Sequence, residues 1–98
     1  MPRATASVNG IVVAETDSYE VVDGNIYFPP HTITKSHFTP TSTQTHCPYK
    51  GNANYYSVTT NKMEIRDAAW YYADPLPSMN KIRGYVAFYK GVADVRTS

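Results

Sequence analysis

Short runs of strand-forming residues alternate with tight-turn sequences through the first third of the chain. Asn9-Gly10 and Asp23-Gly24-Asn25 each stand between two such runs. Asn-Gly and Asp-Gly between strand formers indicate β-hairpins, because these residues tolerate the positive φ that a tight hairpin turn requires. The flanking strands are predicted at residues 4–8, 11–15, 19–22 and 26–28. Pro29-Pro30 ends the last of them, since proline cannot donate to a strand ladder.

The remainder of the chain predicts further short strands. Residues 31–46 are polar and rich in threonine, without a helical period. They favour two strands, at about 34–38 and 43–46, interrupted by Pro40. Later strands are predicted at residues 54–60, 64–72, 85–89 and 92–96. The run 64–72 is predicted to be the longest strand.

Residues 77–82 form the only predicted helix. Pro77 suits a first helical turn, and Gly84 follows the expected end. About eight short strands at close spacing predict an all-β, mainly antiparallel fold with this one short helix. The chain length predicts a single small domain over residues 1–98.

Charge and composition exclude several classes of protein. The net charge is +1 and both signs are scattered, so no clustered basic face for nucleic acid is expected. No apolar run approaches the ~20 residues of a membrane span, and no signal-peptide core is present. We expect a cytoplasmic protein without a membrane or nucleic-acid partner. A single cysteine rules out an internal disulfide and a multi-cysteine zinc cage, and no metal or other cofactor is expected.

Aromatic residues are unusually frequent for a domain of this size. The chain holds nine Tyr, three Phe and one Trp, and tyrosine suits half-buried sheet surfaces with its hydroxyl toward water or ligand. Trp70 and Tyr72 share one face of the predicted strand 64–72, and Ala69 and Tyr71 share the other. Trp70 and Tyr72, together with the turn at residues 47–51, predict an aromatic-walled pocket for a small molecule. Plain core packing of the same rings is the alternative.

The sequence Cys47-Pro48-Tyr49-Lys50-Gly51 could carry chemistry in two ways. A nucleophilic cysteine needs a lowered pKa, but in a strand the adjacent His46 points to the opposite face. A half-buried structural thiol is therefore favoured for Cys47. Lys50-Gly51 lacks the G-x-x-x-x-G-K-[ST] pattern of a phosphate loop. Lys50 either directs a point charge into a pocket or lies exposed in the turn.

Other titratable residues do not form a convincing site. Glu15 and Asp17 resemble a metal-binding carboxylate pair only in spacing, and a solvated turn is favoured. His31, His37 and His46 match no metal-ligand spacing.

Five segments together resemble one protein family. They are "NGIVVAET", "YFPP", "THCPYKGNANYYSV", "AAWYYADPLP" and "KIRGYVAFY". Their order and spacing resemble the bacterial and fungal family catalogued as domain of unknown function 427, over about residues 4–96. The resemblance implies a small β-tent fold, similar to that of B-type methionine sulfoxide reductases and of the thalidomide-binding domain of cereblon. Zinc is not carried over, because relatives in that fold group use four cysteines.

The family's blocks correspond here to Tyr27, Phe28, Pro29, Cys47, Pro48, Tyr49, Lys50, Gly51, Tyr55, Trp70, Tyr72, Pro75, Gly84, Phe88 and Tyr89. One departure is His31-Thr32, where an acidic residue follows the Phe-Pro stretch in many relatives, so a polar contact from that position is not carried over to this chain. The family also carries a nucleotidyl-transferase-like label. No metal-carboxylate set or glycine-rich loop in this sequence supports that activity.

The leading hypothesis is a monomeric module that binds an unidentified small molecule. Trp70, Tyr72 and Tyr27 would form the walls, with Lys50 and Cys47 at the polar end. The first alternative is an enzyme that acts on a small substrate through Cys47 or Lys50. The second is a protein-interaction domain that uses an exposed strand.

Overall fold

A computed structural model describes residues 3–98, which fold into three antiparallel sheets. The strands are β1 (Ala4–Val8), β2 (Ile11–Thr16), β3 (Glu20–Val22), β4 (Asn25–Tyr27), β5 (Phe38–Cys47), β6 (Gly51–Thr60), β7 (Met63–Tyr71), β8 (Val86–Phe88) and β9 (Asp94–Thr97). Every pairing between these strands is antiparallel. The predicted all-β fold and both predicted amino-terminal hairpins are therefore confirmed.

Helical structure in the described residues is limited to three 3-10 segments. They are η1 (Pro30–Thr32), η2 (Lys35–His37) and η3 (Pro77–Ile82). The predicted helix at 77–82 is confirmed as η3, with Pro77 at its start and a kink at Met79. Gly84 follows it with φ of 75°. Within residues 3–98 no helix has the length and hydropathy needed to cross a bilayer.

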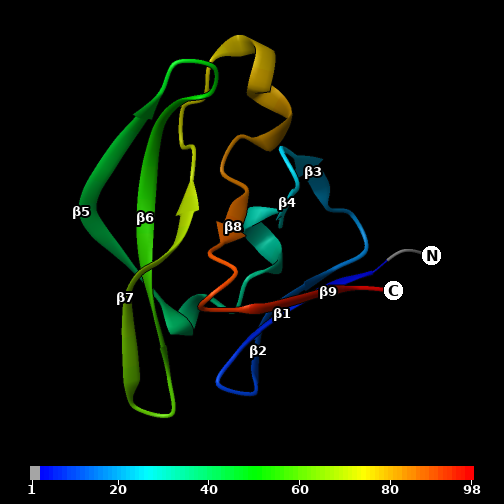
Figure 1. The fold of residues 1–98 in the computed structure, drawn as a ribbon, viewed down its shortest axis with the longest axis vertical. Coiled ribbons are helices and arrows are strands. Elements are labelled where there is room, and N and C mark those ends of the chain that lie inside the picture. Colours follow the sequence, from blue (N-terminus) through cyan, green and yellow to red (C-terminus); the bar gives the residue numbers. More distant parts are fainter. Residues whose placement is uncertain (1–2) are drawn as a thin grey trace.

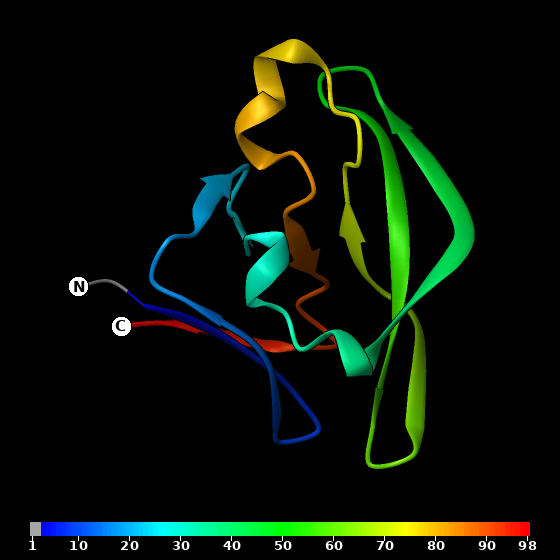
Figure 2. The ribbon, with the colours of Figure 1, turned by 180° about the vertical axis from the view of Figure 1, so that it is seen from behind.

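The two larger sheets face each other at a steep angle. Figure 1 shows β5, β6 and β7 upright on the left and β8 in the middle of the molecule, with the sheet β2-β1-β9 at the lower right. The hairpin β3-β4 fills the third side and joins β8 through the bridge between Phe28 and Val86. Arg3 and Ser98 lie side by side and exchange backbone hydrogen bonds. Seen from behind, η1 and η2 lie between the two larger sheets (Figure 2).

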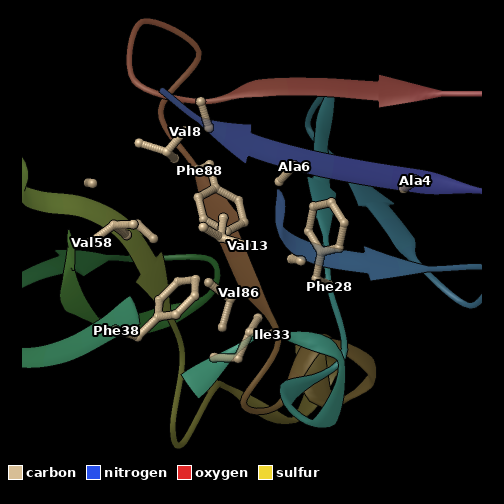
Figure 3. Packing of buried hydrophobic residues seen from close by; sticks show 14 residues of the cluster. Ala4, Ala6, Val8, Val13, Phe28, Ile33, Phe38, Val58, Val86 and Phe88 are labelled. Atoms are coloured by element: carbon tan, nitrogen blue, oxygen red, sulfur yellow. The ribbon is translucent and has the colours of Figure 1, made fainter. Parts of the chain in front are cut away.

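The main core fills the space between these sheets. Phe28 and Phe88 are buried and meet edge to face, with ring centroids 5.6 Å apart. Phe38 contacts Phe88 on its other side at 5.9 Å. Figure 3 shows these rings together with Val13 and Val86, contributed by strands of both larger sheets. Burial of this apolar surface is the main force that holds the sheets together.

Two predictions for the threonine-rich region are wrong, the strand at about 34–38 and the interruption at Pro40, whereas the predicted strand 43–46 lies within β5. Residues 35–37 form η2 and not a strand, and β5 is one continuous strand that runs past Pro40. β5 is an edge strand, so its outer side has no neighbouring strand and no ladder hydrogen bond that proline could remove. A register shift between Pro40 and Gln44 absorbs the irregularity. The prediction that residues 64–72 form the longest strand is also wrong, since β7 has nine residues and β5 and β6 have ten each.

A bulge in β7 determines toward which face of the sheet the side chains of this strand point. Asp67 has φ of 53° in mid-strand, and its carboxylate accepts hydrogen bonds from the hydroxyls of Thr41 and Thr43, both at 2.7 Å. These two hydrogen bonds lower the pKa of Asp67. The neighbouring register shift between Tyr56 and Val58 accompanies the bulge. Bulges bend a strand and redirect its side chains, and here the bulge separates the β6–β7 hairpin from the part of the sheet that carries the candidate site.

Candidate functional site

The four-stranded sheet buries aromatic and apolar residues on both faces. One face supplies the main core, and the other supplies a second cluster. This second cluster comprises Val22, Tyr27, Ala53, Tyr55, Tyr72, Ile82 and Ala87, with Cys47, Trp70, Met79 and Tyr85 packed against it. Trp70 and Tyr72 lie in the second cluster, whereas Ala69 and Tyr71 lie in the main core. The predicted division of these four side chains between two faces is confirmed.

A cavity of about 170 Å³ opens on the second cluster. We call it the aromatic cavity. Its lining residues are Asn25, Tyr27, Lys50, Ala53, Tyr55, Trp70, Tyr72 and Tyr89. Of the five residues predicted to bind a ligand, Tyr27, Lys50, Trp70 and Tyr72 line it, and Cys47 lies beside it.

Strand pairing brings the aromatic walls together. Tyr55 of β6 lies directly opposite Trp70 of β7. The Trp70 ring meets Tyr27 edge to face at 6.3 Å and Tyr89 at 4.8 Å. Tyr55 and Tyr89 are nearly parallel, with centroids 6.5 Å apart. Four strands or strand ends thus contribute one ring each.

Hydrogen bonds between side chains hold these rings in place. The Trp70 Nε1–H donates to the Tyr27 hydroxyl at 3.2 Å. The Tyr89 hydroxyl donates to the Tyr55 hydroxyl at 3.4 Å, and Thr45 Oγ1 lies 2.9 Å from the same oxygen. Because each of these rings is restrained by a neighbour, the walls of the cavity are largely preformed.

Lys50 supplies the only formal charge in the lining. The turn is anchored by hydrogen bonds from Lys50 N–H to the Cys47 carbonyl and from Leu76 N–H to the Lys50 carbonyl. The Lys50 side chain is only 13% exposed, so it is not a freely solvated turn lysine. Its Nζ donates to Asp23 Oδ2 and lies 3.9 Å from Cys47 Sγ. The hydrogen bond to Asp23 raises the pKa of Lys50.

Three tyrosines of the cavity have raised pKa values. Burial raises the pKa of Tyr27, and it raises the pKa of Tyr72 to about 12. The hydrogen bond to Tyr55, together with burial, raises the pKa of Tyr89 to about 12. At neutral pH Tyr27, Tyr72 and Tyr89 therefore offer neutral phenol hydroxyls, and Lys50 offers an ammonium group.

These shifts predict a loss of stability in alkali. The pKa values of Lys50, Tyr72 and Tyr89 are all raised above their unfolded values of about 10. Between about pH 10 and pH 12 the native state therefore binds more protons than the unfolded state, and the free energy of unfolding falls as pH rises. Thermal melts followed by circular dichroism should show Tm decreasing through this range. Tyr72→Phe should make the decline shallower, and an equally steep decline would contradict this assignment.

Cys47 and His46 point in different directions, as predicted from their adjacency in a strand. Cys47 packs half-buried against the second cluster, and His46 Nδ1 lies 2.8 Å from Asn52 Oδ1. Across residues 3–98 no three His, Cys, Asp or Glu side chains gather as a metal site would require. Glu15 is paired with Arg3 at 3.1 Å, which lowers the pKa of Glu15.

A second, larger hollow of about 370 Å³ lies elsewhere on the surface. It is lined by Gly24, Asn25, Ile26, Phe88, Lys90, Ala93, Asp94, Val95 and Thr97. Its charged side chains, Lys90 and Asp94, belong to exposed residues, and Asp94 is already bound to Arg96 at 2.8 Å. The aromatic cavity is smaller, but its polar groups converge on one space and are mutually oriented. It is therefore the better candidate for a specific site.

Sequence reasoning missed Asp23 as the partner of Lys50, and it missed four lining residues, Asn25, Ala53, Tyr55 and Tyr89. Tyr55 could have been found, because it shares a strand face with Ala53 beside the predicted pocket. Asp23 and Asn25 were assigned only to a hairpin turn. Their place at the cavity depends on how β4 docks against the sheet, for which the local sequence holds no signal.

Comparison with known proteins identifies the family. The family model described as a domain of unknown function (DUF427) matches residues 2–98 and so includes every residue of the aromatic cavity. A search of curated proteins finds no match. Since the match spans almost the entire length, the chain belongs to the DUF427 family.

Proposed function

We propose that this domain binds a small molecule in the aromatic cavity, with Lys50 as its polar contact. The observation that carries the proposal is the position of Lys50. An ammonium on a largely buried side chain lines a cavity whose other large residues are four tyrosines and one tryptophan. Such a combination of apolar walls and few oriented polar groups is typical of ligand sites.

The volume limits the size of the ligand. Pockets for drug-sized molecules measure roughly 300–1,000 Å³, and the aromatic cavity measures about 170 Å³. It suits one planar ring with a polar substituent. The rings of Tyr27, Trp70 and Tyr89 would contact its faces and edges, and the tyrosine hydroxyls would provide hydrogen bonds.

The charge of the lining favours a ligand with an acceptor or an anionic group. The pKa of Lys50 is raised, so the ammonium is present throughout the physiological range. Lysine acts on such groups as a point charge without the bidentate geometry of arginine. We infer a soluble, monomeric binding module. The single free cysteine is compatible with a cytoplasmic location.

The two alternative functions have weaker support. Catalysis through Cys47 would use its contact with Lys50 at 3.9 Å. Cys47 is not among the lining residues, however, so a ligand in the cavity would not meet its sulfur directly. A protein-interaction role would use the open edge of β5 or β9, and Pro40 on β5 disfavours strand addition there.

Binding is tested by amide NMR titration of labelled protein. The panel contains nucleotides with and without magnesium, sugar phosphates, amino acids, cyclic imides and single-ring acids and amides. We expect saturable shifts of the Trp70 indole signal for at least one class. Lys50→Met should weaken binding of an anionic ligand about 10-fold or more, because charge-assisted hydrogen bonds contribute about 1.5–3 kcal/mol.

Two matched variants control for this result. Lys50→Arg keeps the charge and should retain part of the affinity. Lys90→Met removes the same charge from an exposed lysine of the larger hollow and should leave affinity unchanged. Absence of saturable shifts across the panel, or equal binding by wild type and Lys50→Met, would show the proposal to be wrong.

A further inference from the structure

Asp23 reaches the candidate site from a separate hairpin. It lies in the turn between β3 and β4, where Asp23 has φ of 52° and Gly24 has φ of 78°. This turn places the Asp23 carboxylate on Lys50 Nζ, although the two residues are 27 positions apart. An ion pair between two turns thus engages Lys50, the one charged residue of the cavity lining.

The two members of this ion pair differ strongly in exposure. The Lys50 side chain is 13% exposed, whereas that of Asp23 is 69% exposed. The ammonium therefore belongs to the cavity, and the carboxylate approaches it from the solvent side. Ion pairs with an exposed partner are weak and exchangeable. The Asp23 carboxylate could therefore separate from Lys50 and become solvated without opening the core.

The contact between Lys50 and Asp23 indicates which chemical group the Lys50 ammonium binds. In the described residues its one anionic partner is a carboxylate, which it binds through a single oxygen. The cavity lining carries one positive charge and no negative charge. A monocarboxylate would neutralise this charge, whereas a doubly charged phosphate would leave an excess negative charge beside Asp23.

We propose that Asp23 is an internal carboxylate that competes with the ligand for Lys50, and that the ligand class is a small single-ring carboxylate. This inference rests on the proposed function of the aromatic cavity. The ring would lie among Tyr27, Trp70 and Tyr89, and its carboxylate would replace that of Asp23 on the ammonium. The displaced Asp23 would then be solvated at the exposed hairpin tip.

The test compares benzoate with its neutral isostere benzamide, using the Trp70 indole signal as the reporter. Asp23→Asn removes the competing charge, and asparagine tolerates the positive φ at this position. We expect benzoate to bind Asp23→Asn about 3- to 10-fold more tightly than wild type, given the modest strength of such pairs. Benzamide affinity should not change.

Two further variants keep the test specific. Asp17→Asn makes the same charge change at another exposed position and should leave benzoate affinity unchanged. Asp23→Gly supplies a second variant without a carboxylate, should asparagine perturb the turn, and an amide spectrum checks that each variant is folded.

The possible outcomes separate the two proposals. Equal or weaker benzoate binding by Asp23→Asn and Asp23→Gly, with shifts still seen at Trp70, would overturn the competition by Asp23 and leave the binding function standing. Weaker binding would, in addition, make Asp23 a positioning residue for Lys50. No Trp70 shift in any variant, with benzoate, benzamide or the wider panel, would overturn both proposals.

Discussion

Tyr27→Ala is expected to lower the free energy of unfolding by about 3–5 kcal/mol, the usual cost of removing a buried aromatic ring. Tyr27 is 1% exposed and is among the largest fully buried side chains. Its ring supports Trp70 edge to face, and its hydroxyl accepts the Trp70 Nε1–H. For a small domain this loss is a large part of the total stability, which is about 5–15 kcal/mol. Urea denaturation measures it directly.

Tyr27→Phe separates the ring from the hydroxyl. The ring and its packing remain, and only the acceptor of the Trp70 N–H is lost. Because Trp70 is partly exposed, water can replace that acceptor, and the cost should stay near 0.5–1.5 kcal/mol. If the two variants were equally stable, the ring of Tyr27 would not be the support of the cavity wall that the structure indicates.

The parts of the fold that were predictable are those determined by neighbouring residues. Asn9-Gly10 and Asp23-Gly24 have positive φ, as expected of hairpin turns, and the strands beside them form where predicted. The alternation of Trp70 and Tyr72 with Ala69 and Tyr71 also follows from strand geometry alone. These features need no knowledge of the rest of the chain.

The wrong strand predictions concern segments whose structure depends on tertiary contacts. The polar residues of β5 satisfy no simple strand pattern, and the strand continues past Pro40 because its ladder runs on one side only. Hydrogen bonds from Thr41 and Thr43 to Asp67 join β5 to a bulge 24 or more positions away. No local rule predicts a left-handed aspartate within a strand.

The same distinction applies to the site. Trp70 and Tyr72 could be placed on one face because they belong to one strand. The role of Lys50 required the knowledge that Asp23 lies against it from another hairpin. Tyr89 becomes a wall only because β8 pairs with β7. Sequence reasoning therefore found Tyr27 and the side chains of one strand and one turn. The structure added Asp23, Asn25, Tyr55 and Tyr89, which the docking of separate elements brings to them.

Gly51→Val is expected to destabilise the domain by about 2–4 kcal/mol through backbone strain and crowding. Gly51 has φ of 109°, which residues with a Cβ rarely adopt. A Cβ at this position would lie 3.4 Å from the backbone nitrogen of Leu76 and 3.5 Å from the Asp74 carbonyl oxygen. The additional methyl groups of valine would press on the segment that donates to the Lys50 carbonyl. Chemical denaturation gives the loss of stability.

Two comparison variants separate the backbone strain caused by Gly51→Val from the crowding that its side chain causes. Gly91→Val adds the same side chain where no atom lies within 4 Å and φ is not left-handed, so it should change stability by less than about 0.5 kcal/mol. Gly51→Ala should retain the φ strain with little crowding, because its contacts at 3.4–3.5 Å are ordinary van der Waals distances. A Gly51→Val protein as stable as wild type would mean that the turn can relax. The backbone of the turn would then not fix the position of Lys50. This result would contradict the proposal that the cavity is preformed.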